Sequence, residues 1–393
     1  MKHSWPISPI RILHVIPSLE GGAGRGVLEI IRSLQNDDRF EVRLCVLGDP
    51  PTDPAQLLKE PVEYLHAPVH QRSLYFRRWT RLRRLISGWQ PRLLHTHLWP
   101  SVRAAGLVAP RSLPHLIHIR DTPPSMMSPR WGAALRRLEL RHIVANSQVR
   151  FVSVSSAAAD FTAHALSLDC RRIQTVLNGV ELDAFLAVRP LCPHPERRFV
   201  IGCAGRLIAD KGFDIVLTAI SRIGLPRDQF LLRIAGSGSG EPALRELAHT
   251  LGIAESVEFL GHVTDMPQFM AGIDLFVHAS VAAEGLSRAL IEAQAAGRPV
   301  VTSDHAGARE AIDNEVTGVI VPAGDPSALA RAIDSFINDS TQWLAMGTAG
   351  RERAARVFSA QRVVNELTEI YTQMLDGPLC EISSPPRSEW PVV

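Results

Sequence analysis

The stretch Ala282–Arg298, AAEGLSRALIEAQAAGR, decides how the rest of the sequence is interpreted. Ser287 is placed to cap a helix that runs to about Ala296, because a serine side chain accepts a bond from an N–H group of the first turn. Gly297 is expected in the left-handed position that closes a helix, and Pro299 prevents the helix from continuing. The free N–H groups at the start of this helix form a natural seat for a pyrophosphate.

Two carboxylates flank that seat at different depths. Glu284 precedes Gly285 at the start of the helix, and Glu292 lies roughly 7 Å further along the axis at a rise of about 1.5 Å per residue. A sugar nucleotide would place its phosphates at the helix dipole and hydroxyl-bearing rings on either side, each bonded by a carboxylate. The competing interpretation is a solvated surface helix with two ordinary glutamates.

Length and composition indicate a globular protein of two domains. The chain has 393 residues, of which 46% are hydrophobic and 21% charged, and its formal net charge is +2. The cysteines are odd in number and scattered, which favours a reducing compartment and argues against a structural zinc site. They are Cys45, Cys170, Cys192, Cys203 and Cys380. Because no long apolar run occurs, we expect a cytoplasmic protein, with peripheral membrane contact left open.

The first half of the chain repeats a strand, loop and helix pattern. Ile10–Ile16 is a β-branched apolar run typical of a buried parallel strand, and it leads to a glycine loop that contains Gly21 and Gly22. This loop either contacts a phosphate or acceptor or is a structural tight turn. Its spacing is not the G-x-G-x-x-G of a dinucleotide site. Further strands are expected at Val42–Leu47, Glu63–Leu65, Leu93–Leu98, His115–Ile119 and Val152–Val154.

Two arginine-rich segments, Ser73–Trp89 and Arg130–Arg141, are expected to be helical. In the first, apolar residues line one face and arginines crowd the others. Such a helix could lie on anionic lipid. Alternatively, it is a crossover helix that packs on the sheet and extends its arginines into water.

Polar residues mark the ends of two strands in this half. His95 and His97 lie two residues apart and therefore on one face of their strand. They could contact a ligand at the cleft between the domains, serve as structural histidines, or bind a metal, although no third ligand lies at a supporting spacing. Arg120 and Asp121 follow the strand at His115–Ile119, where ligand sites of α/β proteins collect.

The proline-rich segment Val188–Arg198 is a good linker, and the strand, loop and helix pattern then restarts. Arg206 and Lys211 lie five residues apart in the first loop of the new domain. They could bind a diphosphate or be two solvated charges. Later strands deliver further glycine loops, one containing Gly236. The last helices are expected at Pro326–Ile337, Arg351–Phe358 and Arg362–Leu375.

This pattern predicts an α/β protein of two doubly wound, Rossmann-like domains with a cleft between them. We place an N-terminal, acceptor-side domain at residues 1–187, a linker at 188–198, a nucleotide-sugar domain at 199–361 and a tail at 378–393. No nucleic-acid-binding motif is found, so no nucleic acid partner is expected.

These motifs together resemble the retaining family 4 glycosyltransferases of the GT-B fold, over about residues 10–375. The resemblance rests on an ordered set: Gly21-Gly22, the His95/His97 strand, Asn178-Gly179-Val180, Arg206 with Lys211-Gly212, Gly236-Ser237-Gly238, Glu284-Gly285 with Glu292-Ala293, and Gly297-x-Pro299. It implies that the last helix, about residues 362–377, crosses back to the N-terminal domain. It also implies a nucleotide-sugar donor, UDP- or GDP-linked, and no metal or other cofactor.

The resemblance assigns roles to single residues. Glu284 would bond hydroxyls of the donor sugar, with backbone groups of Gly285, Leu286 and Ser287 near the diphosphate, and Glu292 would hold the ribose. Two further pairs complete the donor site: the cations Arg206 and Lys211 would neutralise the leaving diphosphate, and Gly21 and Gly22 would approach it from the other domain.

The sequence departs from the family at several positions. Arg120 stands where a histidine that touches the donor sugar is common. Leu286 replaces a usual aromatic residue, Ser287 stands where proline or a small residue is usual, and Gly24 stands where an acidic residue is frequent. His97, Arg120 and Asp121 are therefore predicted only as acceptor or sugar contacts.

The expected activity is retaining transfer of a sugar to a glycan, lipid-linked or small-molecule acceptor. The arginine-rich helices favour an anionic or lipid-linked one. Two alternatives stay open. A nucleotide-sugar 2-epimerase would need a dense set of acid and base residues, which the sequence does not show. A catalytically weak sugar-nucleotide-binding or scaffold protein is suggested by Arg120.

Overall fold

The computed structural model describes residues 8–50, 62–66, 75–121, 131–146, 148–191, 197–282 and 284–376. The predicted tail at 378–393 and residues 192–196 of the predicted linker lie outside the described residues. The chain divides into two compact units: unit 1 is formed by Met1–Val176 and Val364–Val393, and unit 2 by Leu177–Val363. The change of unit therefore falls before the predicted linker.

Unit 1 contains a parallel sheet of seven strands in the order β3-β2-β1-β4-β5-β6-β7. Its strands are β1 (Ile10–Ile16), β2 (Phe40–Val46), β3 (Val62–Tyr64), β4 (Leu93–His97), β5 (His115–Ile119), β6 (Val149–Ser153) and β7 (Ile173–Thr175). Its helices are α1 (Gly21–Gln35), α2 (Tyr75–Trp89), α3 (Trp99–Val108), α4 (Trp131–Val144) and α5 (Ser156–Leu166). The strands predicted here are confirmed to within a few residues, whereas α3 was not predicted.

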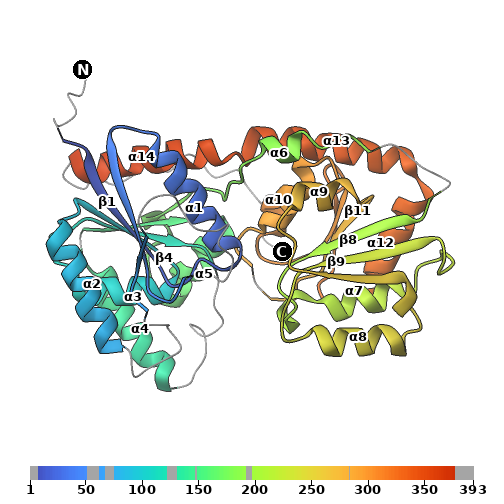
Figure 1. Cartoon of the computed structure of the whole chain (residues 1–393), viewed down its shortest axis with the longest axis horizontal. Coiled ribbons are helices and arrows are strands. Elements are labelled where there is room, and N and C mark those ends of the chain that lie inside the picture. Colours follow the sequence, from blue (N-terminus) through green and yellow to red (C-terminus); the bar gives the residue numbers. More distant parts are fainter. Residues whose placement is uncertain are drawn as a thin grey trace. The chain divides into compact units, whose positions relative to one another are not determined.

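The alternation of β1 explains the layers of unit 1. Leu13 and Val15 enter one core cluster with residues of α2 and α3. Ile16 packs instead with α1, on the other face. The last helix, α14 (Ala360–Asp376), joins the α1 face of this unit through Tyr371, which packs against Phe40. Figure 1 shows the red end of α14 beside β1. The predicted return of the last helix to the N-terminal domain is confirmed.

Helix α2 settles one of the alternatives left open by the sequence. Its apolar residues Leu82, Ile86 and Trp89 are buried against the sheet, so α2 is a crossover helix. Phe76 at its start is 74% exposed, and Arg83 and Arg84 are exposed as well. Among the described residues, no helix is both long and apolar enough to span a membrane.

Unit 2 contains a parallel sheet of six strands in the order β10-β9-β8-β11-β12-β13. Its strands are β8 (Phe199–Ala204), β9 (Phe230–Ala235), β10 (Val257–Gly261), β11 (Leu275–His278), β12 (Val300–Ser303) and β13 (Val319–Val321). Its helices are α6 (Asp183–Leu186), α7 (Phe213–Ile220), α8 (Glu241–Thr250), α9 (Met266–Ala271), α10 (Arg288–Ala295), α11 (Ala308–Ala311), α12 (Pro326–Asn338) and α13 (Ser340–Val357).

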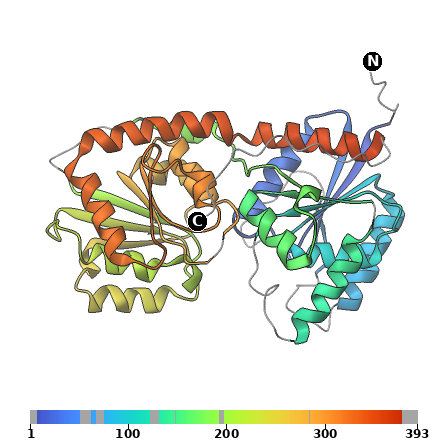
Figure 2. The ribbon, with the colours of Figure 1, turned by 180° about the vertical axis from the view of Figure 1, so that it is seen from behind.

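Helices cover both faces of this second sheet. Figures 1 and 2 show α7 and α8 on one face and α9 and α10 on the other. The core lies between the sheet and α7, α8 and α12, where Phe230, Leu232 and Ile333 are fully buried. Two parallel sheets that are each covered by helices confirm the predicted α/β, doubly wound class.

Candidate functional site

The topology of unit 2 selects one edge of its sheet for chemistry. Strands β8 and β11 are neighbours, but the chain continues from β8 toward β9 and β10 on one side and from β11 toward β12 and β13 on the other. In doubly wound sheets, ligands bind at the carboxyl ends of strands where the order reverses in this way. Arg206 and Lys211 follow β8, and Glu284 follows β11. Lys211 and Glu284, two of the predicted donor-site residues, and the loop of Arg206 therefore lie at the reversal point.

A close backbone contact positions the loop that carries Lys211. Gly212 ends the short 3₁₀ turn Ala209–Lys211 with a φ of +63°, and a Cβ there would lie 2.0 Å from the carbonyl oxygen of Ala279. Only glycine permits this approach. The Ser280 hydroxyl also donates to the carbonyl of Asp210 at 2.9 Å. The loop after β8 is thereby fixed to the end of β11.

Lys211 and Glu284 form an ion pair in this position. The lysine Nζ donates to Glu284 Oε1 at 2.5 Å, and the two side chains are 23% and 16% exposed. The Nε2 atom of His278 lies 3.6 Å from the same carboxylate oxygen. Burial alone would raise the pKa of Glu284, but the proximity of His278 and Lys211 outweighs it and lowers the pKa to about 2. Glu284 is therefore an anion at neutral pH.

His278, at the end of β11, is a fully enclosed part of the same cluster. Its Nε2 lies 3.3 Å from Ser287 Oγ, and its Nδ1 lies 3.4 Å from Thr302 Oγ1 on β12. Burial lowers the pKa of His278 to about 3, so the ring is neutral. The sequence did not identify His278, because its partners come from two other elements.

The predicted cap by Ser287 is wrong. Ser287 does occupy the N-cap position of α10, but its hydroxyl makes no capping bond and pairs with His278 instead. The first-turn N–H groups of α10 are thus left without a side-chain acceptor from Ser287, which suits an anion. At the other end Gly297 has a φ of +68°, as predicted.

Arg206 and Gly236 lie on two loops that pack face to face. Gly236 has a φ of +147°, and a Cβ there would lie 1.8 Å from the carbonyl oxygen of Gly205. The Leu207 N–H also donates to the Ser237 carbonyl at 2.9 Å. Gly236 therefore fixes the backbone of the Arg206 loop, and the side chain of Arg206 is exposed.

Glu292 is buried within α10, with 1% of its side chain exposed, and lies 3.9 Å from Arg288 Nε. Arg288 in turn donates to the Gly179 carbonyl at 2.7 Å, and the Asn178 amide contacts the Leu286 carbonyl at 3.5 Å. The Asn178-Gly179 turn is therefore joined to both the loop before α10 and its first turn. The sequence singled out that turn but not Arg288.

Unit 1 has an equivalent reversal between β1 and β4. The expected glycine loop after β1 is shorter than predicted, because α1 already begins at Gly21, which has a φ of +79°. Gly22 lies in the first turn of α1. A Cβ on Gly24 would lie 1.9 Å from the Leu19 carbonyl oxygen, which explains why no acidic residue stands there. After β4, Leu98 adopts φ +65° and ψ 148°, a conformation that side chains rarely adopt.

The histidines of unit 1 form a buried network rather than an exposed row. His14 of β1 is paired in register with His95 of β4, and its Nδ1 lies 3.0 Å from His97 Nε2. His95 Nε2 lies 3.2 Å from His118 Nδ1, and His95 Nδ1 lies 2.7 Å from the Tyr371 hydroxyl. All four rings are 1% exposed or less. The predicted contact of His97 with a sugar or acceptor gains no support from this position.

Arg120 sets the tautomer of His97, because a guanidinium can only donate. Its Nε donates to His97 Nδ1 at 3.2 Å, so that atom accepts. His97 then donates from Nε2 to His14. Burial, with Arg120 nearby, lowers the pKa of His14 to about 3. Every ring is therefore neutral, and Arg120 is the fixed cation among them.

No third ligand lies at a supporting spacing in the sequence, but the fold brings one beside the pair. His14, His95 and His97 each place a ring nitrogen within 4.8 Å of the others. His14 was missed because it lies on a different strand. The network does not suit a metal cation, however, since Arg120 lies within hydrogen-bond distance of His97 and the His14–His97 contact is already a hydrogen bond.

Asp121 follows Arg120 at the carboxyl end of β5. Burial raises the pKa of its carboxyl group to about 6, and Oδ1 has no hydrogen-bond partner among the described residues. An unpaired buried carboxylate oxygen is costly unless a ligand completes it. The unpartnered Oδ1 of Asp121 is compatible with the predicted contact to an acceptor or a sugar.

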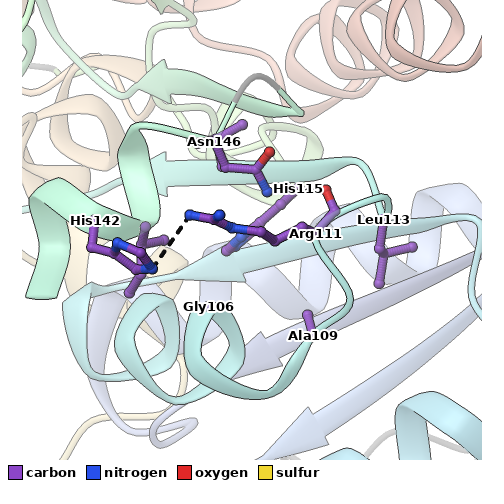
Figure 3. Close-up of a pocket in the computed structure, with 9 residues that line it drawn as sticks. Gly106, Ala109, Arg111, Leu113, His115, His142 and Asn146 are labelled. Carbon is purple, nitrogen blue, oxygen red and sulfur yellow. Dashed lines mark hydrogen bonds between the residues drawn. The ribbon is translucent and has the colours of Figure 1, made fainter.

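A shallow pocket lies at the opposite end of β5, away from these residues. Figure 3 shows Arg111 and His142 reaching toward each other across it, at 3.3 Å between Nη2 and Nε2. His115, at the start of β5, lines its floor and bonds Thr96 at 2.8 Å. Because this pocket lies at the amino ends of the strands, it is not part of the predicted site.

The Lys211–Glu284 pair predicts a pH-dependent loss of stability in a variant. Lys211→Met leaves Glu284 largely buried without its cation and should lower the free energy of unfolding at pH 7 by about 2 kcal/mol. The pKa of Glu284 is lowered on folding, so this stabilisation is present above pH 4.5 and is lost as the pH falls toward 2. Urea unfolding at pH 7, 5.5, 4 and 3 measures the difference.

The double variant Lys211→Met/Glu284→Gln is the control, because it removes the unpaired charge and should recover part of the loss. A difference between wild type and Lys211→Met that is as large at pH 3 as at pH 7 would contradict the proposed ion pair.

Comparison with known proteins identifies the family. Two family models match consecutive parts of the chain: Glycosyltransferase Family 4 at residues 20–184 and Glycosyl transferases group 1 at residues 189–353. A D-inositol 3-phosphate glycosyltransferase from Salinispora tropica is 30% identical over 306 residues, which are 71% of this chain and 63% of that protein. A GDP-mannose-dependent phosphatidylinositol monomannoside mannosyltransferase from Mycobacterium tuberculosis is 33% identical over 44% of this chain and 49% of that protein.

The chain thus spans less than two thirds of the length of these relatives. Among solved structures, HepE from Anabaena with UDP and glucose has a TM-score of 0.79 at 20% identity and covers 92% of this chain and 99% of its own. Sucrose-phosphate synthase from Thermosynechococcus elongatus has a TM-score of 0.80 at 19% identity, with coverages of 93% and 99%. These similarities confirm the GT-B fold. The chain belongs to the family 4, group 1 glycosyltransferases.

Proposed function

We propose that this chain transfers a sugar from a nucleoside diphosphate sugar to a hydroxyl of an acceptor. The observation that carries this proposal is the Lys211–Glu284 pair at the reversal between β8 and β11, beside the start of α10. It puts a cation, an anion and the first turn of a helix at one sheet edge. A phosphate and a hydroxyl-bearing ring together need that combination.

The donor would be bound mainly by unit 2. Lys211 and Arg206 would form ion pairs with its diphosphate. Once Lys211 has turned from Glu284 to the phosphate, Glu284 would accept hydrogen bonds from sugar hydroxyls. Backbone groups of Gly285, Leu286 and Ser287 face the diphosphate. Glu292 holds the ribose, although a shift of the surrounding side chains is required because the carboxylate is 1% exposed without a donor. Within unit 2, the loop of Gly236 would supply backbone groups to the donor; Gly21 and Gly22 of unit 1 stay proposed donor contacts.

The reaction we propose proceeds with retention. The bond between the sugar C1 and the phosphate oxygen breaks, and its electron pair goes to the diphosphate. The acceptor hydroxyl forms the new bond to C1 on the same face, and its proton passes to the leaving diphosphate oxygen. We assign Glu284, once Lys211 has turned to the phosphate, to binding sugar hydroxyls and not to attack on C1. The anomeric configuration of the product, determined by NMR, tests this step.

We infer that the reaction needs no metal. Lys211, Arg206 and the start of α10 supply positive charge where negative charge develops on the diphosphate, and preorganised charge of this kind is usually the largest catalytic contribution. The base of the donor is proposed to be uracil or guanine. A relative is named GDP-mannose-dependent, and the similar HepE structure holds UDP. Unchanged turnover in EDTA would support metal independence. Turnover measured with a panel of UDP- and GDP-linked sugars would test the identity of the base.

The purified chain should release UDP or GDP from a nucleotide sugar and glycosylate an acceptor. Arg206→Ala and Lys211→Ala should each lower kcat by about 100-fold, because a lost donor to a developing anion costs about 3 kcal/mol. Glu292→Gln should weaken the binding of UDP or GDP itself, whereas Glu284→Gln should chiefly lower turnover. Steady-state kinetics and isothermal titration calorimetry measure these effects.

Arg356→Ala is the matched control, because this exposed arginine lies on α13 and takes no part in the proposed site. Transfer rates within threefold of wild type for both Arg206→Ala and Lys211→Ala would overturn the assignment. Binding of nucleotide without hydrolysis or transfer across the whole panel would favour a binding or scaffold protein. A changed sugar without an acceptor would favour a 2-epimerase.

We propose that Asp121 of unit 1 accepts a bond from the acceptor hydroxyl. Asp121→Asn should then lower turnover, yet raise the free energy of unfolding at pH 8 by ~1–3 kcal/mol. The reason is that burial raises the folded-state pKa from 3.8 to about 6, so the ionised carboxylate destabilises the fold above pH 6 and not below pH 3.8. Asp160→Asn on α5, an exposed position, is the control. Equal stability at pH 8, or full activity, would contradict this role.

We further propose that unit 1 meets an anionic, lipid-linked acceptor at a membrane surface through α2, on the cytoplasmic face. The apolar face of α2 is occupied by the core, which leaves the exposed residues Phe76, Arg77, Arg83 and Arg84 for such contact. Replacing the three arginines by glutamate should abolish sedimentation with phosphatidylglycerol vesicles, since each cation contributes about 1 kcal/mol. Equal sedimentation with phosphatidylcholine vesicles would contradict an electrostatic contact.

A further inference from the structure

His305 lies on the loop that follows β12. This loop packs directly against the loop that carries Glu284. A Cβ on Gly307 would lie 1.6 Å from the carbonyl oxygen of Gly285, so the two loops touch through their backbones. The position of His305 is therefore tied to the position of Glu284.

The side chain of His305 is buried, with 7% exposed, yet neither ring nitrogen has a hydrogen-bond partner among the described residues. Its ring centroid lies 5.1 Å from that of His278, whose Nε2 is 3.6 Å from Glu284 Oε1. Leaving a buried polar group unpaired costs about 1–3 kcal/mol, so a ring with two unpaired nitrogens beside a ligand site indicates a partner.

His278 and His305 differ in whether their ring nitrogens have partners. His278 has a hydroxyl at each ring nitrogen, from Ser287 and Thr302, so its hydrogen-bonding capacity is already used. His305 keeps one donor and one acceptor free, because burial lowers its pKa and leaves the ring neutral at pH 7. Glu284, Lys211 and Asp304 are the charged groups that act on it.

A neutral imidazole with one donor and one acceptor matches hydroxyl groups, which also donate and accept. A phosphate offers only acceptors and would leave the second nitrogen unpaired. The two cations of the loop after β8 already serve the phosphate.

We propose that His305 is a specificity-determining residue that hydrogen-bonds a hydroxyl of the transferred sugar beside Glu284. This inference rests on the proposed function. It adds the residue that recognises a hydroxyl of the transferred sugar. The sugar must then carry a hydroxyl on the side that faces the loop after β12. A donor that lacks this hydroxyl leaves the ring unpaired and is rejected.

The test uses the full chain with UDP-glucose or GDP-mannose, whichever the wild type turns over. His305→Ala should raise the KM for the nucleotide sugar about 10- to 100-fold and leave the Kd for UDP or GDP within twofold. His305→Gln should restore part of the affinity, because an amide also donates and accepts. His249→Ala, an exposed histidine on α8, is the matched control.

A series of mono-deoxy sugars on the same nucleotide makes the assignment specific. The wild type should discriminate strongly against one deoxy sugar, and this discrimination should disappear in His305→Ala for that position alone. A purely structural role would instead weaken the binding of UDP or GDP equally, or leave the deoxy series unchanged, and either result overturns the inference.

Failure of the proposed function is a different outcome, because the wild type would then turn over no nucleotide sugar at all. If His305→Ala does not fold, His305→Gln and the wild-type deoxy series still decide the question. No strong discrimination at any hydroxyl would overturn the inference.

Discussion

Three contacts between glycine and a carbonyl oxygen hold the site of unit 2 in place. Gly212 meets Ala279, Gly236 meets Gly205, and Gly307 meets Gly285, each at a distance that no Cβ could occupy. Without these approaches the loops after β8, β11 and β12 would stand further apart. The charged and polar side chains they carry could then not reach one another. Close packing of backbone, made possible by the absence of a side chain, is thus what the chemistry depends on.

The ion pair between Lys211 and Glu284 follows from that packing and has a cost. Both side chains are largely buried, and Glu284 is stabilised by His278 as well as by Lys211. In the function proposed above, the ligand would have to separate the pair, the diphosphate taking Lys211 and the sugar hydroxyls taking Glu284. A nucleoside diphosphate without a sugar would replace only one partner. The pair would therefore favour the intact donor.

The sequence predicted most of the fold because parallel strands are continuous apolar runs separated by glycine loops. It missed α3, and it recognised only the end of α13, where the helix begins at Ser340. Gly347 and Gly350 lower the helix propensity of that segment. Gly347 has a tertiary reason to be there, since a Cβ would lie 2.5 Å from the Gly297 carbonyl oxygen. Packing overrode propensity at this point.

The candidate site was predicted where its residues are close in sequence. Glu284 and Lys211 each belong to a local motif, whereas His278, Thr302 and His305 come from different elements and meet only in the folded sheet. The same holds for His14, which is paired with His95 by the register of β1 and β4. Spacing along the chain carries no information about such pairs. A register prediction for the sheet would have found them.

Arg120 is the departure from the family that the structure explains most directly. Burial keeps the four imidazoles neutral, and the Arg120 guanidinium beside them lowers their pKa values further, because protonating a ring would place two positive charges together. Arg120 also fixes the proton of His97 on Nε2, from which it is donated to His14. The guanidinium thus has a structural role in unit 1. The neighbouring Asp121 is left as the polar group with unused capacity at the end of β5.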